Sequence, residues 1–135
     1  MVDMSLGELQ ALAAKAARGA GLSWGLAEEA GWAVRWLEAR GLAGAAALAG
    51  VLPEGAPQIA LGAALADGST PEPPAEAAQH LLLRPFLEDT PSTQTRAQIS
   101  QDTLRVLNRY ASRTYAPATE ASRLAGAGAG LSDND

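Results

Sequence analysis

The first twenty residues carry hydrophobic side chains at the three- and four-residue intervals of an amphipathic helix. Within residues 6–20 the leucines and most alanines fall on one face, and the charged side chains fall on the opposite face. Ser5 and Glu8 have the spacing of a capping box, and Gly21 can adopt the left-handed conformation that ends a helix. We therefore expect the first helix to run from Ser5 to about Gly21.

A second helix is expected from Ser23, a natural N-cap, to about Arg40, with Gly41 closing it. Its main apolar face is a stripe at helical spacing: Leu26, Ala30, Ala33, Val34 and Leu37. Trp32 and Trp36 lie ~120–180° around the helix from the centre of that stripe. The helix is thus apolar on two sides. Either it lies between two layers of its own domain, or it presents tryptophans to a partner.

The hydrophobic pattern becomes less decisive in the middle of the chain. Residues 42–52 predict a short, glycine-weakened helix that stops at Pro53. The apolar run at 57–68 is ambiguous between a buried helix and a strand. The run at 80–87 is a candidate strand or another buried segment, and Pro85 would confine such a strand to a sheet edge.

Polar and proline-rich segments separate these runs from the last helix. Residues 69–76 form a proline-rich joint and residues 88–95 form a polar loop. The last helix is expected over residues 100–115, starting at Ser100 and stopped by Pro117. Its apolar face is expected to hold Leu104, Leu107, Ala111 and Tyr115.

Together these elements predict one domain, residues 1–135, of a mainly α class. Helices are expected within 5–52 and 100–115, and a glycine-rich tail over 124–135. The alternative is an α+β fold with one or two short strands in 58–87, if residues 58–66 or 81–87 pair as strands.

Composition narrows the possible chemistry. The chain has no cysteine and one histidine, His80, which excludes disulfides, thiolate zinc sites, a cysteine nucleophile and a multi-histidine metal site. The net charge is −5 and neither half of the chain is basic, so nucleic acid is not expected as a partner. No apolar run is long enough for a membrane span and no signal peptide is recognisable, so we expect a cytoplasmic bacterial protein without a cofactor.

The carboxyl-terminal tail carries three alternating glycines, Gly126, Gly128 and Gly130. They do not predict a phosphate loop, because no helix can follow them and present its N-terminal amides to a phosphate. The polar end holds Asp133, Asn134 and Asp135, which are candidate Mg²⁺ or Ca²⁺ ligands, although adjacent carboxylates on a chain end are usually solvated. The tail is expected to be a plain chain end or, alternatively, a segment that docks in a groove of its own protein or of a partner.

Arginines provide a candidate anion-binding site. They repeat at helical spacing along the last helix and recur in the tail: Arg105, Arg109, Arg113 and Arg123. The alternative, which the pattern favours, is a solvated helix face that also carries Asp102. His80 is a candidate general base, but a boundary histidine that caps or packs is favoured over it because no acid or nucleophile is paired with it.

Two stretches carry a resemblance to a known family. Residues 5–31, "SLGELQALAAKAARGAGLSWGLAEEAG", and residues 113–135, "RTYAPATEASRLAGAGAGLSDND", resemble the two ends of the DUF3726 family of uncharacterised bacterial proteins. The family has a longer middle, so residues 57–98 are an abbreviated version of it. The resemblance implies no activity, but it implies that the tail is a recurring feature.

The first two helices are also similar to the amino-terminal region of the type 2 malate/L-lactate dehydrogenases. Those enzymes place a Ser-His-Gly motif after the second helix, with the histidine acting in hydride transfer. The corresponding residues 40–52 contain no histidine, and the nucleotide-binding part is absent. Shared helical packing is expected and dehydrogenase activity is not.

The functional expectation is a non-catalytic assembly or accessory subunit, with a protein partner or a second copy bound through Trp24, Trp32, Trp36 and the tail. The alternative is a small-molecule protein that binds an anion, or a metal-independent enzyme, using the arginines of the last helix with His80 as base.

Overall fold

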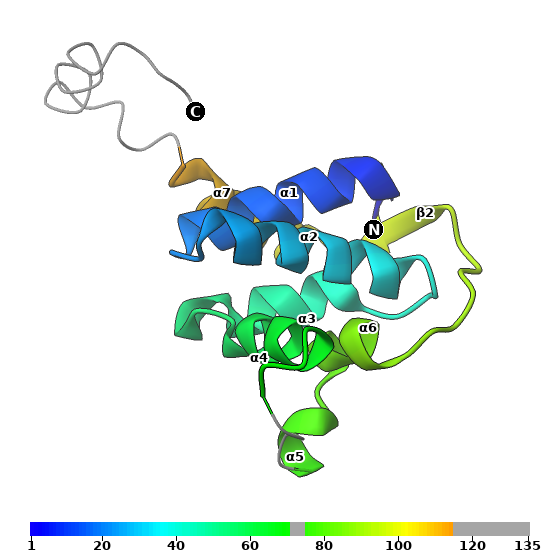
Figure 1. Ribbon diagram of the computed structural model, residues 1–135. Coiled ribbons are helices and arrows are strands. Elements are labelled where there is room, and N and C mark those ends of the chain that lie inside the picture. Colours follow the sequence, from blue (N-terminus) through cyan, green and yellow to red (C-terminus); the bar gives the residue numbers. More distant parts are fainter. Residues whose placement is uncertain (71–74, 115–135) are drawn as a thin grey trace, which may run out of the picture.

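Helices make up most of the protein, as the computed structural model shows for residues 1–70 and 75–114 (Figure 1). The described elements, in chain order, are β1 (Val2–Ser5), α1 (Leu6–Gly19), α2 (Trp24–Glu38), α3 (Gly44–Val51), the 3₁₀ helix η1 (Leu52–Glu54), α4 (Pro57–Ala66), α5 (Ala75–Ala78), the 3₁₀ helix η2 (Leu81–Leu83), α6 (Arg84–Leu87), β2 (Arg96–Ile99) and α7 (Gln101–Ser112). The mainly α class is confirmed.

The first two helices begin and end where their local signals predict. The Ser5 hydroxyl accepts from the backbone N–H of Glu8 at 3.1 Å, and the Glu8 carboxylate accepts from the Ser5 N–H at 3.1 Å, so the capping box is complete. Ser23 caps α2 in the same way, through a 3.3 Å bond from the N–H of Leu26. Gly21, with φ of +106°, follows the end of α1, as expected for a residue with no Cβ to clash.

Helix α2 lies at the centre of the molecule. It packs against α1 on one side and against α3, α4 and α6 on the other (Figure 1). Gly31 lets α1 approach closely, because a Cβ there would come within 2.7 Å of the Gln10 carbonyl oxygen. α2 therefore lies between two layers of its own domain, and the binding of a partner by its tryptophans stays a prediction.

The strand alternative for residues 58–66 and 81–87 is wrong, because both runs are helical. Residues 57–66 form α4, and residues 81–87 form η2 followed by α6. Pro85 stands in the first turn of α6, where a helix tolerates proline because the N–H it lacks would have no intrahelical acceptor. Tertiary burial decided the ambiguous pattern: Ile59, Leu82 and Leu83 have no exposed surface.

Two short strands form at positions that the sequence did not indicate. β1 and β2 pair antiparallel, with Val2 opposite Ile99 and Ser5 opposite Arg96 (Figure 1). Each strand leads directly into a helix, at the N-caps Ser5 and Ser100. Four residues are too few for an alternation pattern to stand out, and the two strands lie more than ninety positions apart in sequence.

The last helix packs on α1 and buries Leu107, Tyr110 and Ala111. The backbone of Tyr110 lies so close to Gly19 that a Cβ at that glycine would overlap the Tyr110 carbonyl. α7 ends at Ser112, before the expected limit at residue 115, and the Thr114 hydroxyl then donates to the Ala111 carbonyl at 2.7 Å. Residues 71–74 of the proline-rich joint and the whole tail from residue 115 lie outside the described residues.

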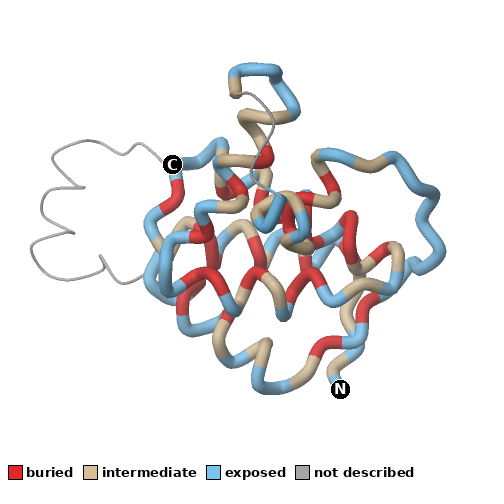
Figure 2. Tube along the Cα trace, turned by 90° about the horizontal axis from the view of Figure 1, so that it is seen from below, coloured by how far each residue is buried: buried red, intermediate tan, exposed pale blue. Residues whose placement is uncertain are grey.

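Burial is concentrated on the inward sides of the helices, and residues 89–96 form a continuous exposed stretch (Figure 2). This stretch confirms the polar loop expected at 88–95. Within the described ranges, none of the helices combines the length and the apolar character that crossing a bilayer requires.

Candidate functional site

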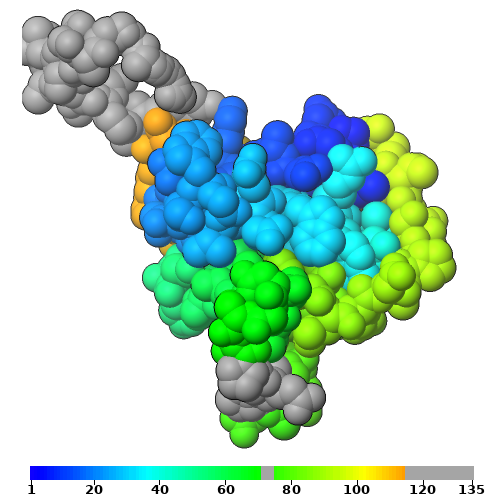
Figure 3. All heavy atoms as spheres, in the orientation of Figure 1, coloured from blue at the N-terminus to red at the C-terminus, as the bar shows by residue number. Residues whose placement is uncertain are grey.

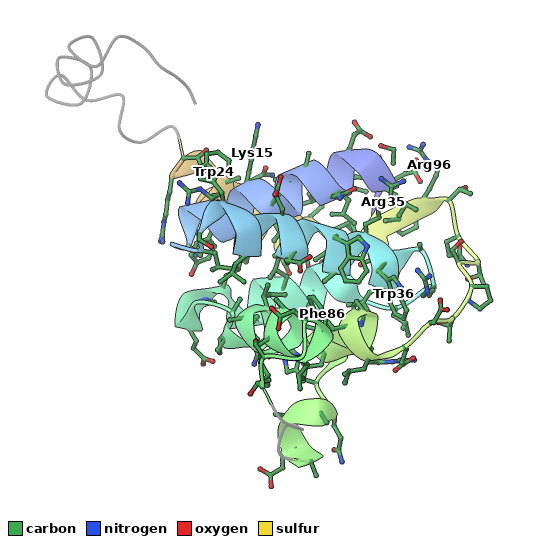
Figure 4. All side chains as sticks on the ribbon, viewed as in Figure 1. Lys15, Trp24, Arg35, Trp36, Phe86 and Arg96 are labelled. Carbon is green, nitrogen blue, oxygen red and sulfur yellow. The ribbon has the colours of Figure 1, made fainter. Side chains whose placement is uncertain are left out.

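The three tryptophans of α2 lie in three different environments. Trp36 is 8% exposed, Trp32 is 37% exposed and Trp24 is 66% exposed. Trp24 lies at the opposite end of α2 from Trp36 (Figure 4), which agrees with a rise of about 1.5 Å per residue over twelve residues. The predicted interface residues therefore do not form one continuous surface, and only Trp32 and Trp36 lie together.

Aromatic and cationic contacts fix the position of this pair. The Trp32 ring meets Phe86 of α6 edge to face, with centroids 5.3 Å apart and an angle of 65° between the rings. The Arg40 guanidinium lies 3.8 Å from the centroid of the Trp36 ring. Phe86 of α6 thus holds the Trp32 indole, and Arg40, just after α2, holds the Trp36 indole.

Arg40 also ties α2 to the polar loop. Its Nε donates to the Thr90 carbonyl at 2.7 Å, and a terminal nitrogen donates to the Trp36 carbonyl at 2.8 Å. The Ala39 carbonyl accepts from the backbone N–H groups of Thr93 and Gln94, at 2.7 and 2.8 Å. The three bonds to Thr90, Thr93 and Gln94 hold an otherwise exposed loop against the end of α2.

A groove of about 550 Å³ lies between this loop, α2 and the start of α1. Its lining residues are Ser5, Leu6, Gly7, Trp32, Arg35, Trp36, Ala39, Arg40, Ser92, Gln94 and Thr95. We call it the Trp–Arg groove. Figure 3 shows the face on which α2 lies between α1 and the segments of the second layer, and Figure 4 places Arg35 and Trp36 at the same end of the molecule.

The charge of the Trp–Arg groove contrasts with that of the whole chain. Two guanidinium groups and no carboxylate line it, although the protein carries a net charge of −5. The Arg35 side chain is exposed and donates to Gln10 Oε1 at 3.0 Å, which orients it along α1. Indole surface beside two guanidiniums suits a ligand that combines an apolar group with carboxylates or another anion.

The capping box of α1 forms one edge of the groove. Hydrogen bonds from the Ser5 backbone and side chain lower the pKa of Glu8 below its ordinary value. The Glu8 carboxylate is thereby engaged with Ser5. The ionised Glu8 carboxylate offsets the partial positive charge of the α1 N-terminus, so the positive charge of the groove comes from Arg35 and Arg40.

The predicted arginine site is not assembled with His80. Arg105 pairs with Asp102 at 2.6 Å, and the Arg113 guanidinium lies 4.4 Å from the Tyr110 ring centroid. His80 instead caps η2, accepting from the Leu82 N–H through Nδ1 at 3.1 Å, so the boundary-histidine interpretation is confirmed. Arg109 is exposed on α7, and Arg123 lies outside the described residues.

Sequence reasoning missed the arginines that do line a groove. Arg35 stands three residues after Trp32, and Arg40 stands four residues after Trp36. Residues at these spacings share a helix face, so the signal was present in the sequence. The contribution of residues 88–95 could not be found in this way, because it depends on contacts between distant segments.

Glu38 is among the residues that line a second, smaller hollow of about 260 Å³. Burial raises the pKa of Glu38 above its ordinary value, opposed by hydrogen bonds from the backbone of Ala45 and Gly44. The bond from the Ala45 N–H is 3.0 Å long, and no side chain at the N-cap position of α3 makes one. Glu38 therefore caps α3 from a neighbouring helix, which is a structural role.

The tail residues named as candidates, from Gly126 to Asp135, lie outside the described residues. Within the part of the chain that the structure describes, no three acidic, histidine or cysteine side chains gather as a metal site would require.

The family model of DUF3726, described as a protein of unknown function, matches residues 4–81, more than half of the chain. The chain belongs to the DUF3726 family. The DUF3726 match includes α1, α2 and the helical wall of the Trp–Arg groove. The stretch 113–135 lies beyond the matched residues, so its resemblance to the end of DUF3726 stays a prediction.

Neither a curated protein nor a solved structure matches the chain. The similarity to type 2 malate/L-lactate dehydrogenases thus remains a resemblance of the first two helices.

Proposed function

We propose that the protein is a non-catalytic assembly or accessory subunit that binds an acidic segment of a partner protein in the Trp–Arg groove. The observation that carries this proposal is the exposed edge of Trp32 beside Arg35 and Arg40, with no carboxylate lining the same groove. A cytoplasmic location belongs to the same proposal.

The residue types support protein binding. Tryptophan and arginine are the residues most enriched among those that dominate binding energy at protein interfaces. The largely buried Trp36 and the loop bonds to Ala39 hold the groove in place before binding, so little conformational entropy would be lost there. An apolar side chain of the partner would cover Trp32, and its carboxylates would meet the guanidiniums.

The test compares matched surface variants. Arg35→Glu and Trp32→Ala are expected to release a partner that co-purifies with the wild type, or to lower the oligomeric mass, while circular dichroism stays unchanged. Arg109→Glu on α7 and Trp24→Ala at the other end of α2 are the controls, and both should keep the complex. A complex that survives both groove variants, or that is lost equally in the controls, would contradict the proposal.

A second candidate function follows from the size of the groove. A volume of about 550 Å³ lies in the range of small-molecule sites, so a free anionic metabolite with an apolar part is the alternative ligand. A thermal-shift screen of aromatic and aliphatic carboxylates tests it. Stabilisation that disappears in Arg35→Gln and persists in Arg109→Gln would favour this alternative over a protein partner.

A further inference from the structure

We propose that the Trp–Arg groove is occupied, when no partner is bound, by the acidic segment 131–135 of the same chain. This inference uses the groove of the proposed function but does not depend on any partner. It makes the end of the tail, which includes the candidate residues Asp133 and Asp135, the occupant of the groove.

The tail is long enough to reach the groove. Thr114 follows α7, whose end lies against Gly19 at the end of α1, whereas the groove lies at the start of α1. The fourteen residues of α1 separate these two points by roughly 21 Å at 1.5 Å per residue. The sixteen residues between Thr114 and Leu131 span up to about 50 Å when extended, so the tail can pass along the molecule with slack.

The chemistry of the segment is complementary to the groove. Asp133 and Asp135 lie two positions apart, so in an extended chain their side chains point the same way, about 6.6 Å apart. Arg35 is exposed on α2, and Arg40 follows the end of that helix with one terminal nitrogen beyond the two that bond Thr90 and Trp36. One carboxylate can therefore pair with the Arg35 guanidinium and the other with the remaining terminal nitrogen of Arg40.

The remaining residues of the segment and the groove also match. Leu131, two positions before Asp133, would lie toward the exposed edge of Trp32. Ser92, Gln94 and Thr95 on the loop side can bond the polar atoms of an extended strand. The alternating glycines before Leu131 place no bulky side chains along the path.

Because the segment belongs to the same chain, even a weak contact with the groove can be populated. A segment attached to the protein is present near its own groove at an effective concentration of about 1 mM. Exposed ion pairs are weak and salt-sensitive, so the segment would be displaced by a partner with more apolar contact. The tail would then act as an intramolecular competitor that sets a threshold for partner binding.

The chain contains no cysteine, so a single introduced cysteine provides one specific labelling site. A nitroxide label on Ser132→Cys in the full chain should broaden the NMR signals of nearby groups, and the three indole N–H signals report on both ends of α2. We expect the Trp32 signal to be broadened several-fold more than the Trp24 signal. In about 1 M salt, where the screening length falls to about 3 Å, the difference should vanish.

Matched variants define the outcome. Arg35→Gln should remove the selective broadening and Arg109→Gln should not, with the rest of the spectrum reporting that each variant is folded. Trp24 lies at the end of α2 near Arg18 and the end of α1, closer to where the tail begins, so an unattached tail would broaden Trp24 at least as much as Trp32. Equal or Trp24-dominated broadening overturns the inference.

A mixing experiment separates the source of the segment. A labelled chain without ¹⁵N is mixed with an unlabelled ¹⁵N chain, and unchanged Trp32 intensity is expected in the mixture. Broadening in the mixture would mean that the segment reaches a second copy, which overturns the same-chain assignment. Because no partner is present, this result is independent of whether the proposed function holds.

Discussion

At the scale of single residues, side chains of one type have separate roles because of what packs against each. Trp36 is almost covered and has Arg40 stacked on its ring, whereas Trp24 is mostly exposed and has Arg18 at 4.3 Å from its ring centroid. Helical arithmetic put Trp32 and Trp36 on a second apolar face, and that placement was right. Helical arithmetic could not predict that Trp36 would be almost covered and Trp32 would stay partly exposed.

Truncation of the tryptophans should therefore give graded losses of stability. Trp36→Ala should lower the free energy of unfolding by about 3 kcal/mol, because it leaves a cavity under a largely buried ring. Trp24→Ala should cost less than about 1 kcal/mol, since it removes an exposed cation–π contact. Urea denaturation measures both, and equal losses would mean that burial does not distinguish the two positions.

Glu38 should give the protein a specific pH dependence. Burial raises the pKa of this carboxyl in the folded state, so the folded state binds its proton more tightly than the unfolded state. The resulting stabilisation is present below the ordinary value of 4.5 and is lost as the pH rises through the raised folded-state pKa. Glu38→Gln removes this titration and can still accept from the Ala45 N–H.

The measurement compares the two proteins across pH. The unfolding free energy of Glu38→Gln minus that of the wild type should increase between about pH 4 and neutrality. Glu38→Ala should be less stable than Glu38→Gln by about 1 kcal/mol, because the Ala45 N–H loses its acceptor. A constant difference across this range would show that the carboxyl does not titrate with a raised pKa.

At the scale of elements, local signals located the helices that begin with a capping side chain. Ser5, Ser23 and Ser100 each accept from a backbone N–H of the helix they precede, as the sequence predicted. α4 and α6 have no side-chain cap, and their apolar runs carried no decisive period. Their helical state came from burial under α2, which a local pattern cannot report.

The contact between α1 and α2 depends on a glycine, and a pair of substitutions tests it. Gly31→Ala should destabilise the protein by about 1–3 kcal/mol, because the new Cβ would press on the Gln10 carbonyl. Gly25→Ala in the same helix meets nothing within 4 Å and should be neutral or slightly stabilising. Thermal unfolding of the two variants measures the difference, and similar melting temperatures would contradict a close helix contact.

At the scale of the whole molecule, the strand pair joins the beginning of the chain to the segment before α7. Asp3 accepts from Arg96 and from Gln98, each at 2.7 Å, and Ile99 is buried beside this pair. Because β1 leads into α1 and β2 leads into α7, the pairing places the starts of these two helices side by side. It also sets the position of the loop that forms one wall of the Trp–Arg groove.

Ile99→Ala should therefore affect the amino terminus as well as its own site. It should lower the free energy of unfolding by about 2–4 kcal/mol and speed amide hydrogen exchange in β1, because Ile99 is buried opposite Val2. Gln98→Ala, one position away and exposed, loses a solvent-exposed bond to Asp3 and should cost about 1 kcal/mol or less. Unchanged exchange in β1 of the Ile99 variant would show that the strands do not depend on each other.

The sequence by itself determined the helical class, the starts of α1, α2 and α7 and the polar loop, because caps and amphipathic periods act between neighbours in the chain. Only the tertiary structure decided the helical state of 81–87, the β1–β2 pair and the Trp–Arg groove. The groove needs Arg40, just after α2, to bind the carbonyl of Thr90, fifty residues further on. Such contacts depend on how the layers pack against each other, and the spacing of residues along one helix does not predict that packing.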